Sequence, residues 1–237
     1  MRAAVALVLV GSLAVSAKAV PLAHAGEIPG AVIVLEAPPG TPGSDPASAP
    51  PRFVLLEDGQ VFAGGTWRLE AGRLEKGEAS ALRKRAEQAL KMPGLASPVV
   101  LGGDASRTLR LRLLEDDPRE IAATGDPAAA PPSLAPLATL LADLLRFDHA
   151  SLRPYSPAGY AMTVRENRRV GGCRAWGFAL PIAEALAGPH AVTAVEASGW
   201  PTGAVPASVC ADDAGPSASA SRRYEVTLRP LLPGEQP

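Results

Sequence analysis

The stretch Phe53-Val-Leu-Leu-Glu-Asp-Gly-Gln-Val-Phe62 carries the clearest local structural signal in the chain. Its two apolar runs flank Asp58-Gly59, and an Asp-Gly pair supplies the positive φ angles that a tight hairpin turn requires. We therefore predict two antiparallel strands joined at this turn. Residues 66–70 are expected to add a third strand.

Two amphipathic helices are predicted from apolar residues at helical spacing. The first covers residues 78–92 and ends at Pro93-Gly94, and the second runs from Ser133, as its N-cap, to residue 147. The apolar stripe of the second helix is wide, which favours packing across a sheet. Its members are Leu134, Leu137, Leu140, Leu141, Leu144 and Leu145.

Clean alternation at residues 108–113 predicts a half-buried strand, with leucines on one face and Arg110 and Arg112 on the other. Residues 119–124 are expected to form the return strand. Further strands are predicted at 160–165, around Trp176 and Phe178, at 191–196 and at 224–229, with a short helix at 181–187. These elements together predict an α+β protein, an antiparallel sheet with two to three helices on one face.

Strand starts near residues 53, 108 and 160 suggest a regular spacing. Leu55-Leu-Glu-Asp58 is echoed by Leu113-Leu-Glu-Asp116. A strand-strand-helix unit used three times would explain both observations. Simple alternation of strands and helices explains them too, and we favour it because the echo is only four residues long.

The first 25 residues resemble an export signal. Met1-Arg2 is followed by an apolar and small-residue run at 3–17 and by Ala23-x-Ala25, a pattern that signal peptidase cleaves. We expect a secreted or periplasmic protein cut after Ala25. Cleavage after Ala17 or Ala19, or an uncleaved anchor helix, are the alternatives, and no stable membrane insertion is expected once the signal is removed.

The rest of the chain divides at a proline-rich segment. Residues 37–52 contain six prolines, a density that blocks helix and central strand alike. We group residues 26–52 as an N-terminal strand, at 30–36, followed by a flexible stretch. Residues 53–237 are predicted to form a single α+β domain.

Composition excludes several classes of function. The 237 residues carry 23 basic and 24 acidic side chains, a net charge of −1 that becomes −3 if Arg2 and Lys18 leave with the signal. A near-neutral chain argues against a nucleic-acid partner or a polybasic membrane anchor.

Cys173 and Cys210 are the only cysteines, so an exported chain favours a disulfide between them over a reactive thiol or a metal ligand.

Catalytic and metal-binding motifs are not found in the sequence. His149 and His190 are interpreted as a helix-capping and a surface residue, and the Gly-Gly turns at 64–65 and 102–103 lack the Lys-Ser/Thr of a phosphate loop. The acidic run 115–117 is interpreted as a hairpin turn, with a calcium site as a weaker reading. No cofactor and no metal site are predicted.

Four residues are the candidates for binding. Arg110, Arg112 and Arg165 could form a basic stripe that recognises an anionic glycan or an acidic partner surface, although we favour the simpler interpretation of a solvated sheet face. Trp200 lies in a Gly/Pro-rich loop near Cys210 and is either an exposed binding residue or a lid over the core.

Several segments resemble a group of exported bacterial proteins and lipoproteins from high-GC genomes. They include 56–61, 155–161, 171–176 and, most specifically, Arg229-Pro-Leu-Leu-Pro-Gly-Glu235. The resemblance extends from about residue 30 to 235 and implies export and a shared fold, with no particular chemistry. This chain departs from the lipoprotein members because it has no cysteine near its N-terminus.

The sequence therefore favours a non-catalytic extracytoplasmic binding or interaction module, with an envelope protein or an anionic glycan as the expected kind of partner. The alternative is a secreted hydrolase that uses dispersed acids, with Glu57 and Asp58 facing Glu115 and Asp116.

Overall fold

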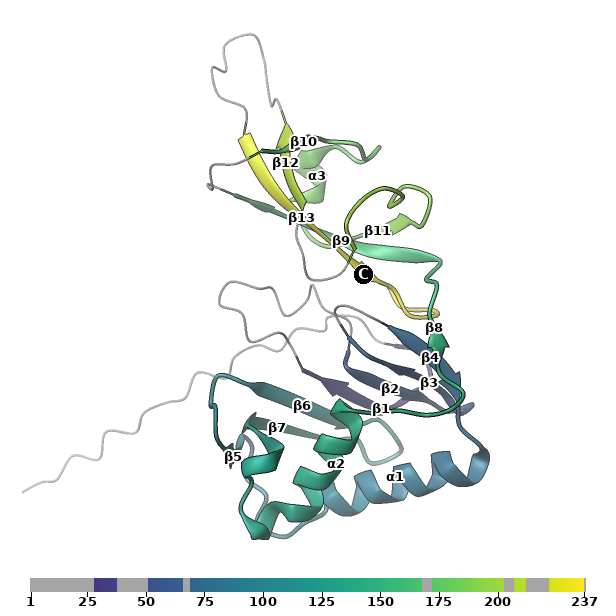
Figure 1. The fold of residues 1–237 in the computed structure, drawn as a ribbon, viewed down its shortest axis with the longest axis vertical. Helices are drawn as coiled ribbons and strands as arrows, with labels where there is room; N and C mark the ends of the chain where they lie inside the picture. The colour runs from purple at the N-terminus through teal and green to yellow at the C-terminus, as the bar shows by residue number, and fades with distance from the viewer. Residues whose placement is uncertain are drawn as a thin grey trace, which may run out of the picture.

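The computed structural model describes residues 28–37, 51–65, 69–167, 172–202, 207–211 and 222–236. The signal sequence and most of the proline-rich segment, both predicted above, lie outside these ranges. The described chain is an α+β protein with two mostly antiparallel sheets and three α-helices (Figure 1). The predicted fold class is confirmed, with two sheets in place of the expected one. No helix among the described residues is long and apolar enough to cross a membrane.

The first sheet has eight strands in the order β5-β7-β6-β1-β2-β3-β4-β8, and only the β5–β7 pair is parallel. Its strands are β1 (Ala31–Glu36), β2 (Phe53–Leu56), β3 (Gln60–Ala63), β4 (Glu70–Arg73), β5 (Val99–Gly102), β6 (Thr108–Leu113), β7 (Arg119–Gly125) and β8 (Arg153–Pro154). Strand β1 lies in the middle, between β2 and β6. The strand predicted at residues 30–36 is therefore an inner part of this sheet, while the division of the chain into domains stays a prediction.

The predicted hairpin is confirmed as the β2–β3 pair. Gly59 has a φ of 85°, and the carboxylate of Asp58 accepts the N–H of Gln60 at 2.9 Å, as an Asp-Gly turn favours. A Cβ at Gly59 would lie 3.0 Å from the carbonyl oxygen of Leu74. The turn therefore needs glycine both for its backbone angles and for close packing.

Two helices cover one face of the first sheet: α1 (Lys76–Leu90) and α2 (Ala135–Leu145) (Figure 1). Helix α1 begins before the predicted residue because the N–H of Glu75 donates to the Glu78 carboxylate at 2.8 Å, which satisfies a free amide at its start. The predicted cap at Ser133 is wrong. Ser133 lies in a 3-10 turn, η3 (Pro132–Leu134), and α2 starts after it.

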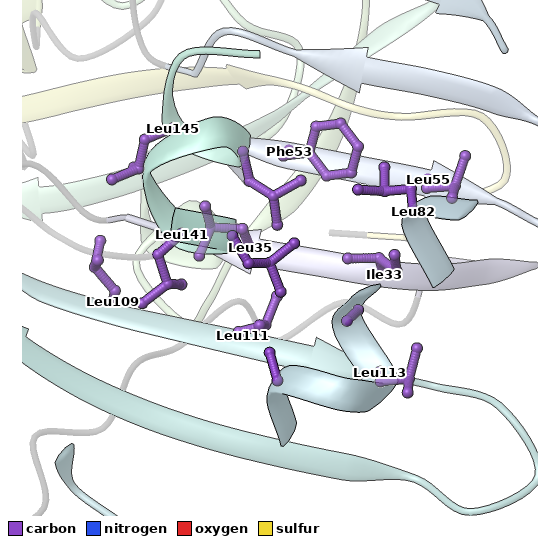
Figure 2. Packing of buried hydrophobic residues seen from close by; sticks show 14 of the residues in the cluster. Ile33, Leu35, Phe53, Leu55, Leu82, Leu109, Leu111, Leu113, Leu141 and Leu145 are labelled. Atoms are coloured by element: carbon purple, nitrogen blue, oxygen red, sulfur yellow. The ribbon is translucent and has the colours of Figure 1, made fainter. Parts of the chain in front are cut away.

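The main core lies between these helices and the sheet. Figure 2 shows leucine, isoleucine and phenylalanine side chains of β1, β2 and β6 pointing toward the helices. The alternation predicted for β6 is confirmed, since its three leucines are buried and its two arginines are on the other face. The labelled members of the cluster are Ile33, Leu35, Phe53, Leu55, Leu82, Leu109, Leu111, Leu113, Leu141 and Leu145.

The second sheet has five strands in the order β10-β12-β13-β9-β11. They are β9 (Gly159–Glu166), β10 (Arg174–Ala175), β11 (His190–Thr193), β12 (Ala207–Ala211) and β13 (Arg222–Pro230), with the short α3 (Ile182–Ala185) packed beside them. The predicted strand around Trp176 and Phe178 is wrong, because β10 ends at Ala175 and both rings pack into the core of this sheet from a loop.

The strand pairing can be compared with the strand-strand-helix repeat that the sequence suggested. The first two rounds of strands each end in a helix on the first sheet, but β9 belongs to the second sheet and pairs with β13 and β11. In chain order the third round also runs strand, strand, helix, as β9, β10 and α3, but β9 does not pair with β10 as β2 pairs with β3 and β6 with β7. The choice between a repeat and simple alternation stays a prediction.

Candidate functional site

The four residues predicted to bind a ligand do not come together. Arg110 and Arg112 lie on β6 in the first sheet, whereas Arg165 lies on β9 in the second and Trp200 packs in the core cluster of that sheet. They therefore do not form a single basic stripe, and each contacts its own neighbours.

Arg110 and Arg112 enclose a buried carboxylate. The Glu36 side chain is only 7% exposed, and its Oε1 lies 2.8 Å from Arg112 Nη2. Arg110 Nε lies 3.3 Å from Glu120 Oε1 and 4.0 Å from Glu36 Oε2. A buried carboxylate requires charged partners, because its desolvation is otherwise costly. The two arginines are thus engaged in holding Glu36.

Trp200 is a half-buried part of the second core. Its ring centroid lies 4.3 Å from that of Phe178, and the guanidinium carbon of Arg174 lies 4.1 Å above its own ring. Arg174 also donates to the carbonyl oxygen of Gly199 at 3.0 Å. This sandwich corresponds to the lid interpretation of Trp200 rather than to an exposed binding residue.

On β9, Arg165 lies opposite Glu225 of β13, a favourable cross-strand charge pair.

The predicted disulfide is present. Cys173 and Cys210 are bonded, with their Cα atoms 5.5 Å apart. The bond lies beside the parallel pairing of β10 with β12, where Ala175 is in register with Cys210. It ties the short edge strand β10, and with it the segment that carries Arg174, to the rest of the second sheet.

A cleft of about 600 Å³ opens at the C-terminal end of α2. We call it the arginine cleft. Its polar lining comes from the residue preceding β2, the β5–β6 turn, the residues after β7 and the end of α2. These polar residues are Arg52, Asp104, Ser106, Arg107, Asp126 and Arg146. Small apolar side chains, among them Ala37 and Ala142, complete the wall.

Arg52 is the fixed member of the cleft. Its Nε and Nη2 donate to the carbonyl oxygen of Leu145 at 2.9 and 2.7 Å, and its Nη1 donates to the carbonyl oxygen of Gly64. Burial, together with the positive charge of Arg107, lowers the pKa of Arg52 from its usual value. A cation at a helix C-terminus is favoured by the helix dipole, so the last turn of α2 stabilises this half-buried charge.

The other two arginines have weaker or no local partners. Arg107 Nη1 lies 4.0 Å from Asp126 Oδ1, which already accepts the N–H of Ala128 at 3.0 Å. The side chain of Arg146 has no ion-pair or hydrogen-bond partner among the residues that the structure describes. Two guanidiniums therefore present N–H donors to the cleft that the described chain leaves largely unused.

Asp104 adds an acceptor to the cleft. Its Oδ1 accepts the N–H of Ser106 at 2.9 Å, and hydrogen bonds from the side chain and backbone of Ser106 lower its pKa. Asp104 follows the Gly102-Gly103 turn, where the Cβ atom that glycine lacks at 102 would lie 2.8 Å from the carbonyl oxygen of Ala129. Close packing against the 3-10 turn η2 (Pro127–Ala129) therefore explains that glycine pair.

A second cavity of about 280 Å³ adjoins the arginine cleft. Arg52, Leu145 and Arg146 line both cavities, so the two adjoin at these residues. Phe147 and Glu70 line the smaller cavity only. The Phe147 ring is half-buried, with its centroid 4.8 Å from that of Phe53.

The four acidic residues considered for catalysis lie at turns, and the carboxylates of Asp58 and Glu115 each face an arginine. Asp58 Oδ2 lies 2.7 Å from Arg73 Nη2, at the hairpin turn. Arg83 donates to the carbonyl oxygen of Glu57 at 2.8 Å and lies 3.8 Å from Glu115. The two echoed segments are thus neighbours at one end of the first sheet, where Arg83 contacts both. In the described parts of the chain, no three His, Cys, Asp or Glu residues are grouped so that they could hold a metal ion.

His149 takes part in a contact chain that the sequence did not suggest. Its Nδ1 lies 2.7 Å from Ser151 Oγ, and its Nε2 lies 3.4 Å from Glu78 Oε1. Ser151 Oγ also accepts the N–H of Arg73 at 3.0 Å and packs tightly against Gly72. The Arg73–Ser151 contact lies two positions beyond the last β4–β8 pair, Ala71 with Arg153, and neither cavity described above is lined by Ser151. His190 lies 2.9 Å from the carbonyl oxygen of Glu184.

No protein-family model, curated protein or solved structure matches the chain, so the resemblance to exported bacterial proteins stays a prediction.

Sequence reasoning missed the arginine cleft altogether. Arg52, Arg107 and Arg146 are widely separated in the sequence, and none belongs to a recognisable motif. The only local signal was indirect. Gly64, from one Gly-Gly pair, lines the smaller cavity, and the other pair, at 102–103, directly precedes Asp104 of the arginine cleft.

Proposed function

We propose that the protein is an exported, non-catalytic binding module and that the arginine cleft is its ligand site. The observation that carries this proposal is the convergence of Arg52, Arg107 and Arg146 on a cavity of about 600 Å³. Small-molecule sites commonly have volumes of roughly 300–1,000 Å³ with a few convergent polar groups. A secreted or periplasmic location is the context that the N-terminal sequence favours.

The charges of the cleft suit binding better than proton transfer. Arginine stays protonated at any physiological pH, and the lowered pKa of Asp104 keeps that carboxylate ionised at neutral pH. General acid–base catalysis needs a group whose pKa lies near the working pH. Fixed charges of both signs instead orient a ligand.

The hydrolase alternative has less support. It requires the acids at the two echoed turns to face a common substrate. Asp58 is bound by Arg73, and Glu115 lies against Arg83. Those contacts support a role for these acids in holding the turns.

The proposal is tested by closing the cleft without changing its charge. Ala142 lines the cleft on α2, and Ala142→Phe should fill it. Thr139→Phe is the matched control, because Thr139 lies on the same helix and lines a different cavity, between α1 and α2. Ligand-observed NMR with a panel of envelope metabolites, both acidic and neutral, should detect binding to the wild type and the control but not to Ala142→Phe.

Two readouts would contradict the proposal. Binding that is unaffected by Ala142→Phe would place the ligand elsewhere on the molecule. Time-dependent conversion of a bound probe into a product, seen in the same spectra, would show that the module is catalytic.

A further inference from the structure

The charge of the arginine cleft restricts which ligands fit it. Three arginines and two aspartates give the lining a formal charge of +1. A single negative charge on the ligand balances it. A neutral ligand leaves the Arg146 side chain without a charge partner, and a compact dianion such as sulfate meets repulsion from Asp104 and Asp126.

The hydrogen-bonding groups restrict the ligand further. Guanidiniums only donate, and ionised carboxylates only accept. A ligand that satisfies both must carry an anionic acceptor and also separate donors. Hydroxyl groups supply such donors without adding charge, whereas the ammonium group of a zwitterion would cancel the negative charge that the lining requires.

The shape of the site favours an elongated ligand. The arginine cleft and the smaller cavity adjoin at three shared lining residues, Arg52, Leu145 and Arg146. A ligand that extends from the cleft past these residues reaches Phe147, where the apolar face of a sugar ring can pack on the aromatic ring. One sugar ring in each cavity would span the two.

On the basis of the proposed function, we propose that the ligand is an acidic glycan unit, a uronic acid linked to a neutral sugar. Arg146 binds the uronate carboxylate as a two-pronged donor, and Asp104 accepts hydrogen bonds from ring hydroxyls. The neutral sugar occupies the smaller cavity beside Phe147. Arg52 acts as a positioning residue, since its guanidinium is committed to the last turn of α2.

Isothermal titration calorimetry with four defined probes tests this assignment. The probes are cellobiouronic acid, its neutral counterpart cellobiose, inorganic sulfate and the zwitterion glycylglycine. We expect cellobiouronic acid to bind most tightly. Loss of a charge-assisted hydrogen-bonding partner in Arg146→Gln should weaken its binding about tenfold or more.

Arg165→Gln is the matched control, because it removes an arginine from the second sheet and should leave the affinity unchanged. Phe147→Leu should weaken cellobiouronic acid binding, while circular dichroism of each variant checks that the fold is kept. Cellobiose, sulfate or glycylglycine binding as tightly as cellobiouronic acid, with Ala142→Phe still blocking it, would overturn the acidic-glycan assignment and leave the proposed binding function standing. Failure of cellobiouronic acid to bind at millimolar concentration would also overturn the assignment, whereas failure of every ligand in the wider NMR panel would overturn the proposed function itself.

Discussion

Arg229 and Glu235 form an ion pair inside the protein, with Nη1 and Oε1 2.7 Å apart and side chains only 5% and 0% exposed. The other oxygen of Glu235 accepts the N–H of Leu232 at 2.9 Å. Gly234 turns the chain between them with a φ of 73°. The sequence Arg229-Pro-Leu-Leu-Pro-Gly-Glu235 is therefore a loop closed by its own first and last residues.

This C-terminal loop connects the two sheets. Arg229 belongs to β13 of the second sheet, whereas Leu232 is buried in an apolar cluster on the face of the first sheet that the helices do not cover. The hydroxyl of Tyr155 donates to the carbonyl oxygen of Leu231 at 3.0 Å. Burial and the nearby charge of Glu235 raise the pKa of Tyr155, so this donor stays protonated.

We predict that Arg229→Met destabilises the protein by about 3–5 kcal/mol, because it leaves the buried Glu235 carboxylate without its cation. Urea denaturation monitored by fluorescence measures the change in the free energy of unfolding. The double variant Arg229→Met/Glu235→Leu should lose less, since no buried charge is left unpaired. Equal losses in the single and double variants would mean that the ion pair contributes little.

The hairpin turn provides a second prediction. Gly59→Ala should lower the free energy of unfolding by more than about 1 kcal/mol, because alanine resists the φ of 85° and its Cβ would crowd the Leu74 carbonyl. Gly77→Ala is the control: Gly77 lies in α1 with open space around it, and alanine should stabilise a helix by up to about 1 kcal/mol. Thermal denaturation of both variants measures this contrast, and a similar loss in both would refute the role assigned to the turn.

The elements that could be predicted from sequence are those determined by local pattern. The β2–β3 hairpin follows from one Asp-Gly pair, and the buried face of α1 follows from spacing alone. The alternation of β6 likewise depends only on neighbouring residues. Each of these elements has its physical cause within about fifteen residues of chain.

Features that depend on distant pairings were missed. The division into two sheets depends on pairing β9 with β13, where Tyr224 lies opposite Glu166, and no local pattern specifies that partner. The arginine cleft forms only because the end of α2 docks against Arg52. The central position of β1 could not be predicted from its own residues. Its partners β2 and β6 lie on either side of α1 in the sequence, and no local pattern links them to β1.

The disulfide leads to a third prediction. Cys173→Ser/Cys210→Ser should lower the free energy of unfolding by about 3–4 kcal/mol, because the bond restricts the unfolded chain between residues 37 positions apart. A thiol titration of the unfolded, unreduced wild type should detect no free thiol. Two free thiols per chain would refute the bond, and an unchanged stability in the double variant would mean that it restricts little. Binding at the arginine cleft should persist in the variant, since the cleft belongs to the first sheet.

The Asp58 carboxylate provides a prediction about pH. The N–H of Gln60, and secondarily the Arg73 guanidinium, hold its pKa below the ordinary value of 3.8. A carboxylate whose pKa is lower in the folded state contributes stability at pH values above 3.8, and this contribution is lost as the pH falls through the folded-state value. Asp58→Asn keeps an acceptor for Gln60 but removes the charge. The wild type should therefore be more stable than this variant at neutral pH, and the difference should shrink as the pH falls below 3.8.

Urea denaturation at a series of pH values measures that difference directly. Asp148→Asn controls for the loss of one negative charge, because Asp148 is exposed, lies in the segment after α2 and makes no hydrogen bond or ion pair with the described residues of the hairpin turn. A stability difference between wild type and Asp58→Asn that stays constant across the acid range would show that ionisation of the Asp58 carboxylate does not contribute to it, and would contradict the prediction. A difference that grows as the pH falls would contradict the lowered pKa itself, since the charged form would then be the less favourable one in the folded protein.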